Sequence, residues 1–156
     1  MEQHESMNEI LNDLVMINND RIAGYEKAIT ELTGLDIDLK AVFEQMITQS
    51  KGYKDELGQK IIANGGTVEN DTTASGKIYR AWMDIKSTLT DADRHSILAT
   101  CEFGEDAAGR AYESALSSGG LHDAATRQLV EEEQASLKKS HDLIKAQREA
   151  HKLLKK

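Results

Sequence analysis

The segment ANGGTVENDTTASGKIYRAWMDIKSTLT, residues 63–90, decides the fold that this sequence predicts. Its first half, residues 63–76, is rich in Gly, Asn, Thr and Ser, a composition that is typical of loops. Its second half predicts a short helix that begins at Ser75, because four apolar residues share one helical face: Ile78, Trp82, Ile85 and Leu89. We therefore expect a long connection in the middle of the chain that carries a short helix of its own.

The rest of the sequence predicts four longer helices on either side of this connection. We expect them to run from about Ser6 to Leu32, from Asp36 or Asp38 to Ala63, from Thr90 or Asp93 to Leu116, and from beyond Gly120 to Leu154. Short turns would join the first two helices and the last two. Two helical hairpins joined by one long crossover form the ferritin-like four-helix bundle. The sequence thus predicts a single all-α domain over residues 1–156, with its core at about 6–154 and its crossover at 63–90.

Local signals predict where these helices begin and end. Ser6 and Glu9 have the spacing of a capping box, in which each side chain bonds the backbone of the other residue. Gly34 follows the first helix and Gly119 follows the third, at positions where glycine commonly ends a helix. We therefore expect the first helix to begin at Ser6 and to stop at Thr33–Gly34.

The composition agrees with an all-α protein and narrows the classes of partner. The chain contains no proline, and only 4% of its residues are aromatic, so helix breakers are absent and strand formers are scarce. Its net charge of -8 argues against nucleic acid or an anionic membrane as a partner. A single cysteine can form no internal disulfide, which fits a reducing cytoplasm. We expect a cytoplasmic protein that does not span a membrane.

Helical projection places polar residues in the middle of each inward face and apolar residues toward its ends. We expect these polar residues to form a buried network: Asn18, Arg21, Tyr25, Ser50, Tyr53, Glu105, Tyr112, Gln134, His141 and Arg148. In it, Glu105 would accept a hydrogen bond from Tyr25 or Tyr53 and would pair with Arg21 or Arg148. A buried carboxylate needs such partners, because its charge is costly to remove from water.

The alternative to this network is a metal site. Ferritin-like di-iron and di-manganese proteins use a Glu from each of two helices and Glu-x-x-His from each of the other two, and this sequence contains no Glu-x-x-His. The candidate ligands are Glu102, Glu105 and His141, which would form at most a degenerate site for Fe, Mn or Zn. Arg21 and Arg148 lie on the inward faces, where they would repel a dication. We therefore favour the network and expect no cofactor.

The level of Glu105 along the bundle also bears on a metal site. Folding the third helix back onto the fourth about Gly119 places Glu105 opposite Gln134. His141 lies seven residues further on, about 10 Å along a helix. This argues against a pair between Glu105 and His141 without excluding it.

Two other features have ordinary structural interpretations. Cys101 lies beside Glu105 on the inward face, where a free cysteine packs as a small apolar residue and a nearby carboxylate raises its pKa. The acidic run Glu131–Glu133 is typical of a solvated face near a helix N-terminus. Neither feature predicts catalysis.

Four segments carry a resemblance to a known family: NDRIAGYEKA (19–28), SGKIYRAWMDIK (75–86), CEFGEDAAGRAYESAL (101–116) and SHDLIK (140–145). They resemble a bacterial four-helix-bundle family that is classed as a domain of unknown function in the ferritin-like superfamily, near the rubrerythrins. The resemblance extends over about residues 8–150. It implies a ferritin-like fold and a bacterial, cytoplasmic protein, but no particular activity.

Two functions remain open from the sequence. The first is a non-catalytic bundle with a structural polar core and a role in binding, assembly or stress. The second is a metal-dependent redox protein of the ferritin or rubrerythrin kind. Assembly of a homo-oligomer through helix faces is compatible with both functions, and the sequence does not identify a small-molecule ligand.

Overall fold

The computed structural model describes residues 2–32, 34–71 and 94–154, and within these ranges the secondary structure is entirely helical. The four helices are α1 (Glu2–Glu31), α2 (Ile37–Ala63), α4 (Arg94–Ser117) and α5 (Ala124–Leu154). The all-α prediction is therefore confirmed. Among the described helices, no segment combines the length and the hydropathy of a membrane span.

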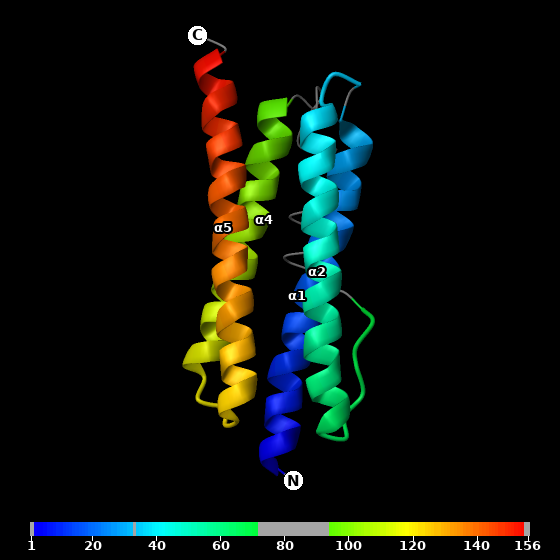
Figure 1. Cartoon of the computed structure of the whole chain (residues 1–156), viewed down its shortest axis with the longest axis vertical. Coiled ribbons are helices and arrows are strands. Elements are labelled where there is room, and N and C mark those ends of the chain that lie inside the picture. The colour runs from blue at the N-terminus through cyan, green and yellow to red at the C-terminus, as the bar shows by residue number, and fades with distance from the viewer. Residues whose placement is uncertain (1, 33, 72–93, 155–156) are drawn as a thin grey trace.

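The order and direction of the helices explain the long connection between α2 and α4. Figure 1 shows α2 and α4 running in the same direction, opposite to α1 and α5. The chain must therefore return along the whole bundle between α2 and α4, as the ferritin-like arrangement requires. α1 packs on α2, α4 packs on α5, and the two hairpins meet mainly through α1 and α4.

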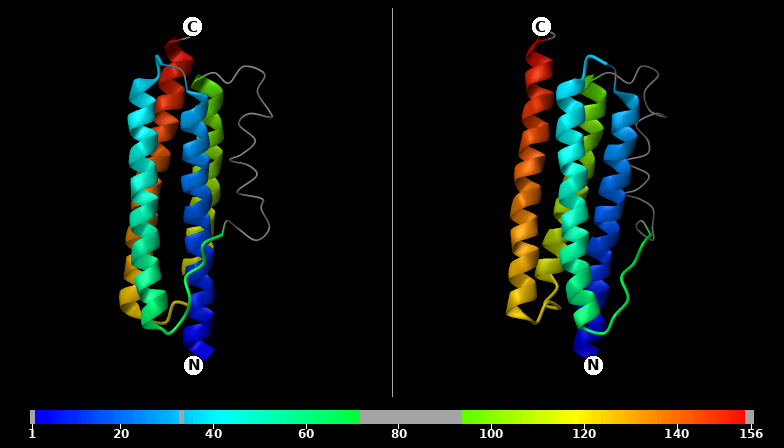
Figure 2. Two further views of the ribbon diagram at one scale, coloured as in Figure 1. Left: turned by 90° about the vertical axis from the view of Figure 1, so that its right-hand side faces the viewer. Right: turned by 45° about the vertical axis from the view of Figure 1, so that its right-hand side comes forward.

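The first part of this connection runs back along α1 (Figure 2). Asn12 Nδ2 donates to the Thr67 carbonyl at 2.9 Å, and Asn19 Nδ2 donates to the Asp71 carbonyl at 2.8 Å. Asparagine side chains of α1 thus hold the returning chain. The short helix predicted at 75–89 and the predicted caps Thr90 and Asp93 lie outside the described residues.

Two apolar clusters fill the bundle on either side of a polar centre. One contains Leu11, Leu57, Ile61, Leu116 and Val130, and the other contains Leu39, Phe43, Ile97, Leu98 and Ile144. Each cluster removes apolar surface from water, which supplies most of the free energy that packs the helices. The expected order along each inward face, apolar at the ends and polar in the middle, is present.

The start of α1 and the capping of α2 differ from the sequence prediction. α1 begins at Glu2, so Ser6 lies within the helix and the capping box at Ser6 was wrong. α1 ends at Glu31, one residue before the predicted Leu32, and Thr33 lies outside the described residues. Asp36 is the N-cap of α2, but its side chain makes no capping hydrogen bond; its Oδ1 lies 3.2 Å from Arg94 Nη1 instead. The ion pair competes for the carboxylate that would otherwise cap the helix.

The α4–α5 connection is longer than the predicted break. It occupies residues 118–123, with Gly119 at φ 75°, a left-handed conformation that glycine adopts without strain. Asp123 then caps α5, because its Oδ2 accepts hydrogen bonds from the backbone N–H of Thr126 at 3.1 Å and from its hydroxyl at 2.7 Å.

Candidate functional site at the centre of the bundle

A buried ion pair between Arg21 and Glu105 lies at the centre of the bundle. Arg21 Nε donates to Glu105 Oε1 at 2.6 Å, and the two side chains are fully buried. Tyr25 donates its hydroxyl hydrogen to the same oxygen at 2.7 Å. Of the partners expected for Glu105, the structure selects Tyr25 and Arg21, both on α1.

The remaining N–H groups of Arg21 point to α2. Nη1 donates to the Met46 carbonyl at 3.2 Å and to Ser50 Oγ at 2.9 Å, and Nη2 donates to Gln49 Oε1 at 3.2 Å. Gln49 Oε1 also accepts from the Ser140 hydroxyl at 2.9 Å, which links α2 to α5. One guanidinium group therefore connects α1, α2 and α4 directly, and α5 through Gln49.

A chain of hydrogen bonds continues from Arg21 to a second buried carboxyl group, that of Glu133. Ser50 donates to Asn18 Oδ1 at 2.9 Å, and Asn18 Nδ2 donates to the Tyr112 hydroxyl oxygen at 2.9 Å. Tyr112 in turn donates to Glu133 Oε1 at 2.7 Å. The chain runs from the Arg21 cation to the carboxyl group of Glu133, with every donor pointing the same way, so each group is polarised in the same sense.

Burial and charge shift the acidity of Arg21, Tyr25 and Cys101 in directions that oppose chemical reactivity. Burial alone would lower the pKa of Arg21, but Glu105 and Tyr25 together outweigh it and the pKa rises. Burial, followed by the charge of Glu105, raises the pKa of Tyr25 and of Cys101 well above their ordinary values. Cys101 therefore remains a thiol that packs as an apolar residue, and no thiolate nucleophile is available.

Glu133 is the main network residue that the sequence analysis missed. Its side chain is buried, whereas Glu131 and Glu132 are exposed, so the solvated face predicted for the run applies to only two of its three acids. The signal that could have found it is a seven-residue repeat of buried polar residues along α5: Thr126, Glu133 and Ser140. Seven residues are two helical turns, so these three side chains share one face.

Three residues expected in the network lie at its edge instead. Gln134, His141 and Arg148 are half-buried, because the inward face of α5 is turned toward Glu133 and Ser140. Their long polar side chains reach the rim, where each one contacts an acid of α4. Tyr53 is buried as expected, but its hydroxyl is not part of the chain of hydrogen bonds from Arg21 to Glu133.

These rim contacts give the register between α4 and α5. Gln134 Nε2 donates to Glu113 Oε2 at 2.9 Å, and His141 Nε2 lies 2.6 Å from Asp106 Oδ1. The prediction that Glu105 lies opposite Gln134 was therefore wrong. Because the connection extends to Asp123, Asp106, the residue next to Glu105, lies at the level of His141.

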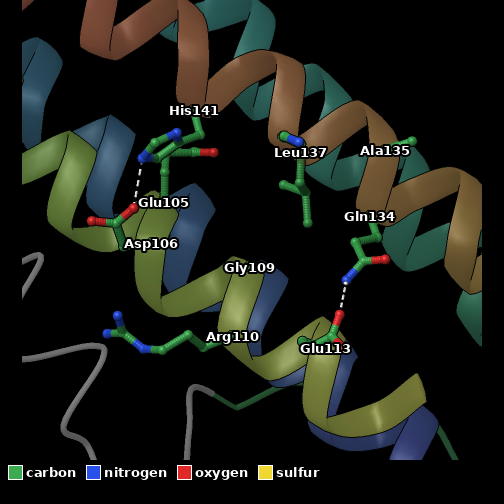
Figure 3. A pocket seen from close by; sticks show the side chains of 10 residues that line it. Glu105, Asp106, Gly109, Arg110, Glu113, Gln134, Ala135, Leu137 and His141 are labelled. Atoms are coloured by element: carbon green, nitrogen blue, oxygen red, sulfur yellow. Dashed lines mark hydrogen bonds and ion pairs between the residues drawn. The ribbon is translucent and has the colours of Figure 1, made fainter. Parts of the chain in front are cut away.

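A groove of about 610 Å³ lies between α4 and α5 at this level. Figure 3 shows the His141–Asp106 and Gln134–Glu113 contacts crossing it, with Gly109 between them and the Glu105 side chain reaching from α4 toward the space between the two helices. Oε2 of Glu105 is buried and accepts no hydrogen bond from the part of the chain that the structure describes. Glu105 is one of the residues that line this groove, so the buried network lies directly beside it.

The three candidate metal ligands do not converge. Glu102 pairs with Arg148, Glu105 with Arg21, and His141 with Asp106. Among the described residues, no group of three or more His, Cys, Asp and Glu side chains could hold a metal ion. A dication at Glu105 would also face the guanidinium of Arg21, so the donor set does not fit the metal centre of the ferritin-like metalloproteins.

Comparisons with known proteins agree with this fold. A family model described as a domain of unknown function (DUF2383) matches residues 6–118. A solved structure of a mutant of Dps1 from Mycobacterium smegmatis matches with a TM-score of 0.80, over 94% of this chain and 97% of that chain, at 16% sequence identity. No curated protein matches the sequence. At this identity the structural likeness shows a shared fold, the ferritin-like four-helix bundle.

Proposed function

This chain belongs to the family described as a domain of unknown function (DUF2383), and from that premise we propose that it is a non-catalytic ferritin-like bundle whose polar centre is structural. Its role is then in binding or assembly. The observation that carries the proposal is the position of Arg21: its guanidinium is 0% exposed and is hydrogen-bonded to Glu105 at the centre of the bundle.

The chemistry of the centre supports this role. Oε1 of Glu105 already accepts two hydrogen bonds, from Arg21 and from Tyr25. The thiol and hydroxyl groups nearby have raised pKa values, so they are poor nucleophiles and poor bases at neutral pH. A network of this kind specifies which helices pack together.

Elemental analysis tests the proposal against a metal-dependent redox function. We expect the chain, purified without chelator, to carry no stoichiometric Fe, Mn or Zn. The variant Glu105→Leu should leave the metal content unchanged and should alter the thermal stability. Stoichiometric iron or manganese in the wild type that is lost in Glu105→Leu, with an anomalous scattering peak near Glu105 in a crystal, would overturn the proposal.

Self-association through a helix face belongs to the same proposal. Phe103 on α4 is 54% exposed, and aromatic side chains are enriched where protein surfaces meet. We expect light scattering to give a mass above the 17.3 kDa of one chain, and Phe103→Glu to lower it. A monomer in the wild type at every concentration would contradict this part of the proposal.

A further inference from the structure

We propose that the groove between α4 and α5 binds a small organic ammonium ion, with Oε2 of Glu105 as its acceptor. The inference rests on the structural role proposed above for Arg21, because that residue holds the other oxygen of the same carboxylate. It adds a ligand class that the network alone does not imply.

The first argument is the unused oxygen. Glu105 is 2% exposed, and its Oε2 has no hydrogen-bond partner among the described residues. A buried carboxylate oxygen without a donor costs free energy, since it has lost its hydrogen bonds to water. A ligand with an N–H donor at this place would remove that cost, and a charged donor forms the stronger bond.

The second argument is the shape of the groove. The contacts His141–Asp106 and Gln134–Glu113 cross between the helices seven residues apart on α4, about 10 Å along its axis. Between them, Gly109 presents no side chain, and Leu137 lines the groove with apolar surface (Figure 3). The space therefore suits a compact apolar body with one donor group at its end.

The third argument is electrostatic. Three carboxylates line the groove, those of Glu105, Asp106 and Glu113, against two cationic side chains, Arg110 and Lys138, and the net charge of the chain is -8, so the groove attracts cations over anions. Arg21 repels a single ammonium charge about half as strongly as it would repel a dication at the same distance. A carboxylate ligand would meet Glu105 with like charge at close range. A neutral alcohol would offer a hydrogen bond without charge. These differences favour a primary ammonium with an apolar stem.

The test uses hexylamine, which is protonated at pH 7, titrated into the full chain with backbone amide NMR as the readout. We expect saturable shifts that include Gly109 and Ala135, two residues that line the groove. We expect 1-hexanol to bind at least about tenfold more weakly, as the loss of a charge-assisted hydrogen bond implies. No saturable shift with hexylamine, or equal affinity for 1-hexanol, would overturn the inference.

Two variants assign the binding to the groove. In Glu105→Gln the amide oxygen still accepts from Arg21 and Tyr25, while the amide nitrogen replaces Oε2 with a donor, so affinity should fall at least about tenfold. In Gly109→Leu the new side chain fills the groove; an added Cβ there meets nothing within 4 Å, so the backbone need not move. This second variant keeps the test valid if Glu105→Gln does not fold.

Gly52→Leu is the matched control, because it makes the same change on α2, where an added Cβ also meets nothing within 4 Å. It should bind hexylamine like the wild type. Unchanged affinity in either groove variant, or equal loss in Gly52→Leu, would contradict the inference. Metal analysis of the same preparations separates the two proposals: a bound metal contradicts the proposed function, whereas metal-free protein that ignores hexylamine contradicts only the ligand site.

Discussion

Glu133 ends the chain of hydrogen bonds in a position where its charge is disfavoured. Burial, with the nearby charge of Glu56 adding to it, raises the pKa of Glu133 from 4.5 to about 8, although the hydrogen bond from Tyr112 acts in the opposite direction. At neutral pH the folded chain therefore tends to hold a proton on this carboxyl group. The unfolded chain releases that proton above about pH 4.5.

The pH dependence follows from these two values. The folded state binds more protons than the unfolded state between pH 4.5 and about 8, so the stabilisation due to Glu133 is complete below pH 4.5 and is lost as the pH rises through 8. We predict that Glu133→Gln, which resembles the protonated acid, loses less stability between pH 5 and 8 than the wild type does. The difference should be on the order of 3 kcal/mol.

Urea unfolding at pH 5, 7 and 8 measures this difference. The exposed neighbour provides the control: Glu132→Gln should follow the wild-type pH dependence. Identical pH profiles for Glu133→Gln and the wild type would show that Glu133 is already ionised in the folded chain.

The elements show where the sequence was informative and where it was not. The inward residues of α1, α2 and α4 follow from the spacing of their apolar residues, and Arg21, Ser50 and Glu105 lie between the apolar clusters as expected. The inward polar residues of α5 were harder to predict. Its buried apolar residues Val130, Leu137 and Ile144 form one stripe, and a buried polar residue could lie on either side of that stripe.

Packing against α2 and α4 determines on which side of the apolar stripe the polar residues of α5 are buried. The sequence of α5 alone does not contain this information. Glu133 meets Tyr112 of α4, and Ser140 meets Gln49 of α2. The length of the α4–α5 connection was likewise underestimated, because Gly119–Gly120 marks where a turn begins and not where the next helix starts. Asp123, the cap of α5, gives the better boundary.

Substitutions of two glycines test the assigned turn after α4 and the helical conformation within α4. Gly119 has a φ of 75°, so Gly119→Ala should strain the turn and cost about 1 kcal/mol. Gly109 lies within α4, and an added Cβ there meets nothing within 4 Å, so Gly109→Ala should stabilise the helix by about 0.5 to 1 kcal/mol. Thermal unfolding of both variants measures these changes in stability. If both substitutions changed the stability equally and in the same direction, the assigned turn would be contradicted.

At the scale of the whole molecule, the order of elements predicted the fold. Two hairpins separated by a long connection leave few arrangements, and α2 and α4 run in the same direction as that order requires (Figure 1). The ferritin-like bundle is thus retained, while its centre contains an arginine–carboxylate pair with polar partners from α2. Since fold and site are separable, the fold alone does not indicate metal chemistry.

A double-mutant cycle of Arg21 and Glu105, followed by urea unfolding, tests most directly whether this pair forms the structural centre. Removing either partner leaves a buried charge uncompensated, so Arg21→Met and Glu105→Leu should each cost about 3 to 5 kcal/mol. The double variant places two apolar side chains in contact and should cost less than either single change. The partly exposed pair Lys27–Glu31 is the control, and Lys27→Met should cost less than about 1 kcal/mol. Single costs below about 1 kcal/mol, or costs that simply add in the double variant, would contradict a structural ion pair at the centre of the bundle.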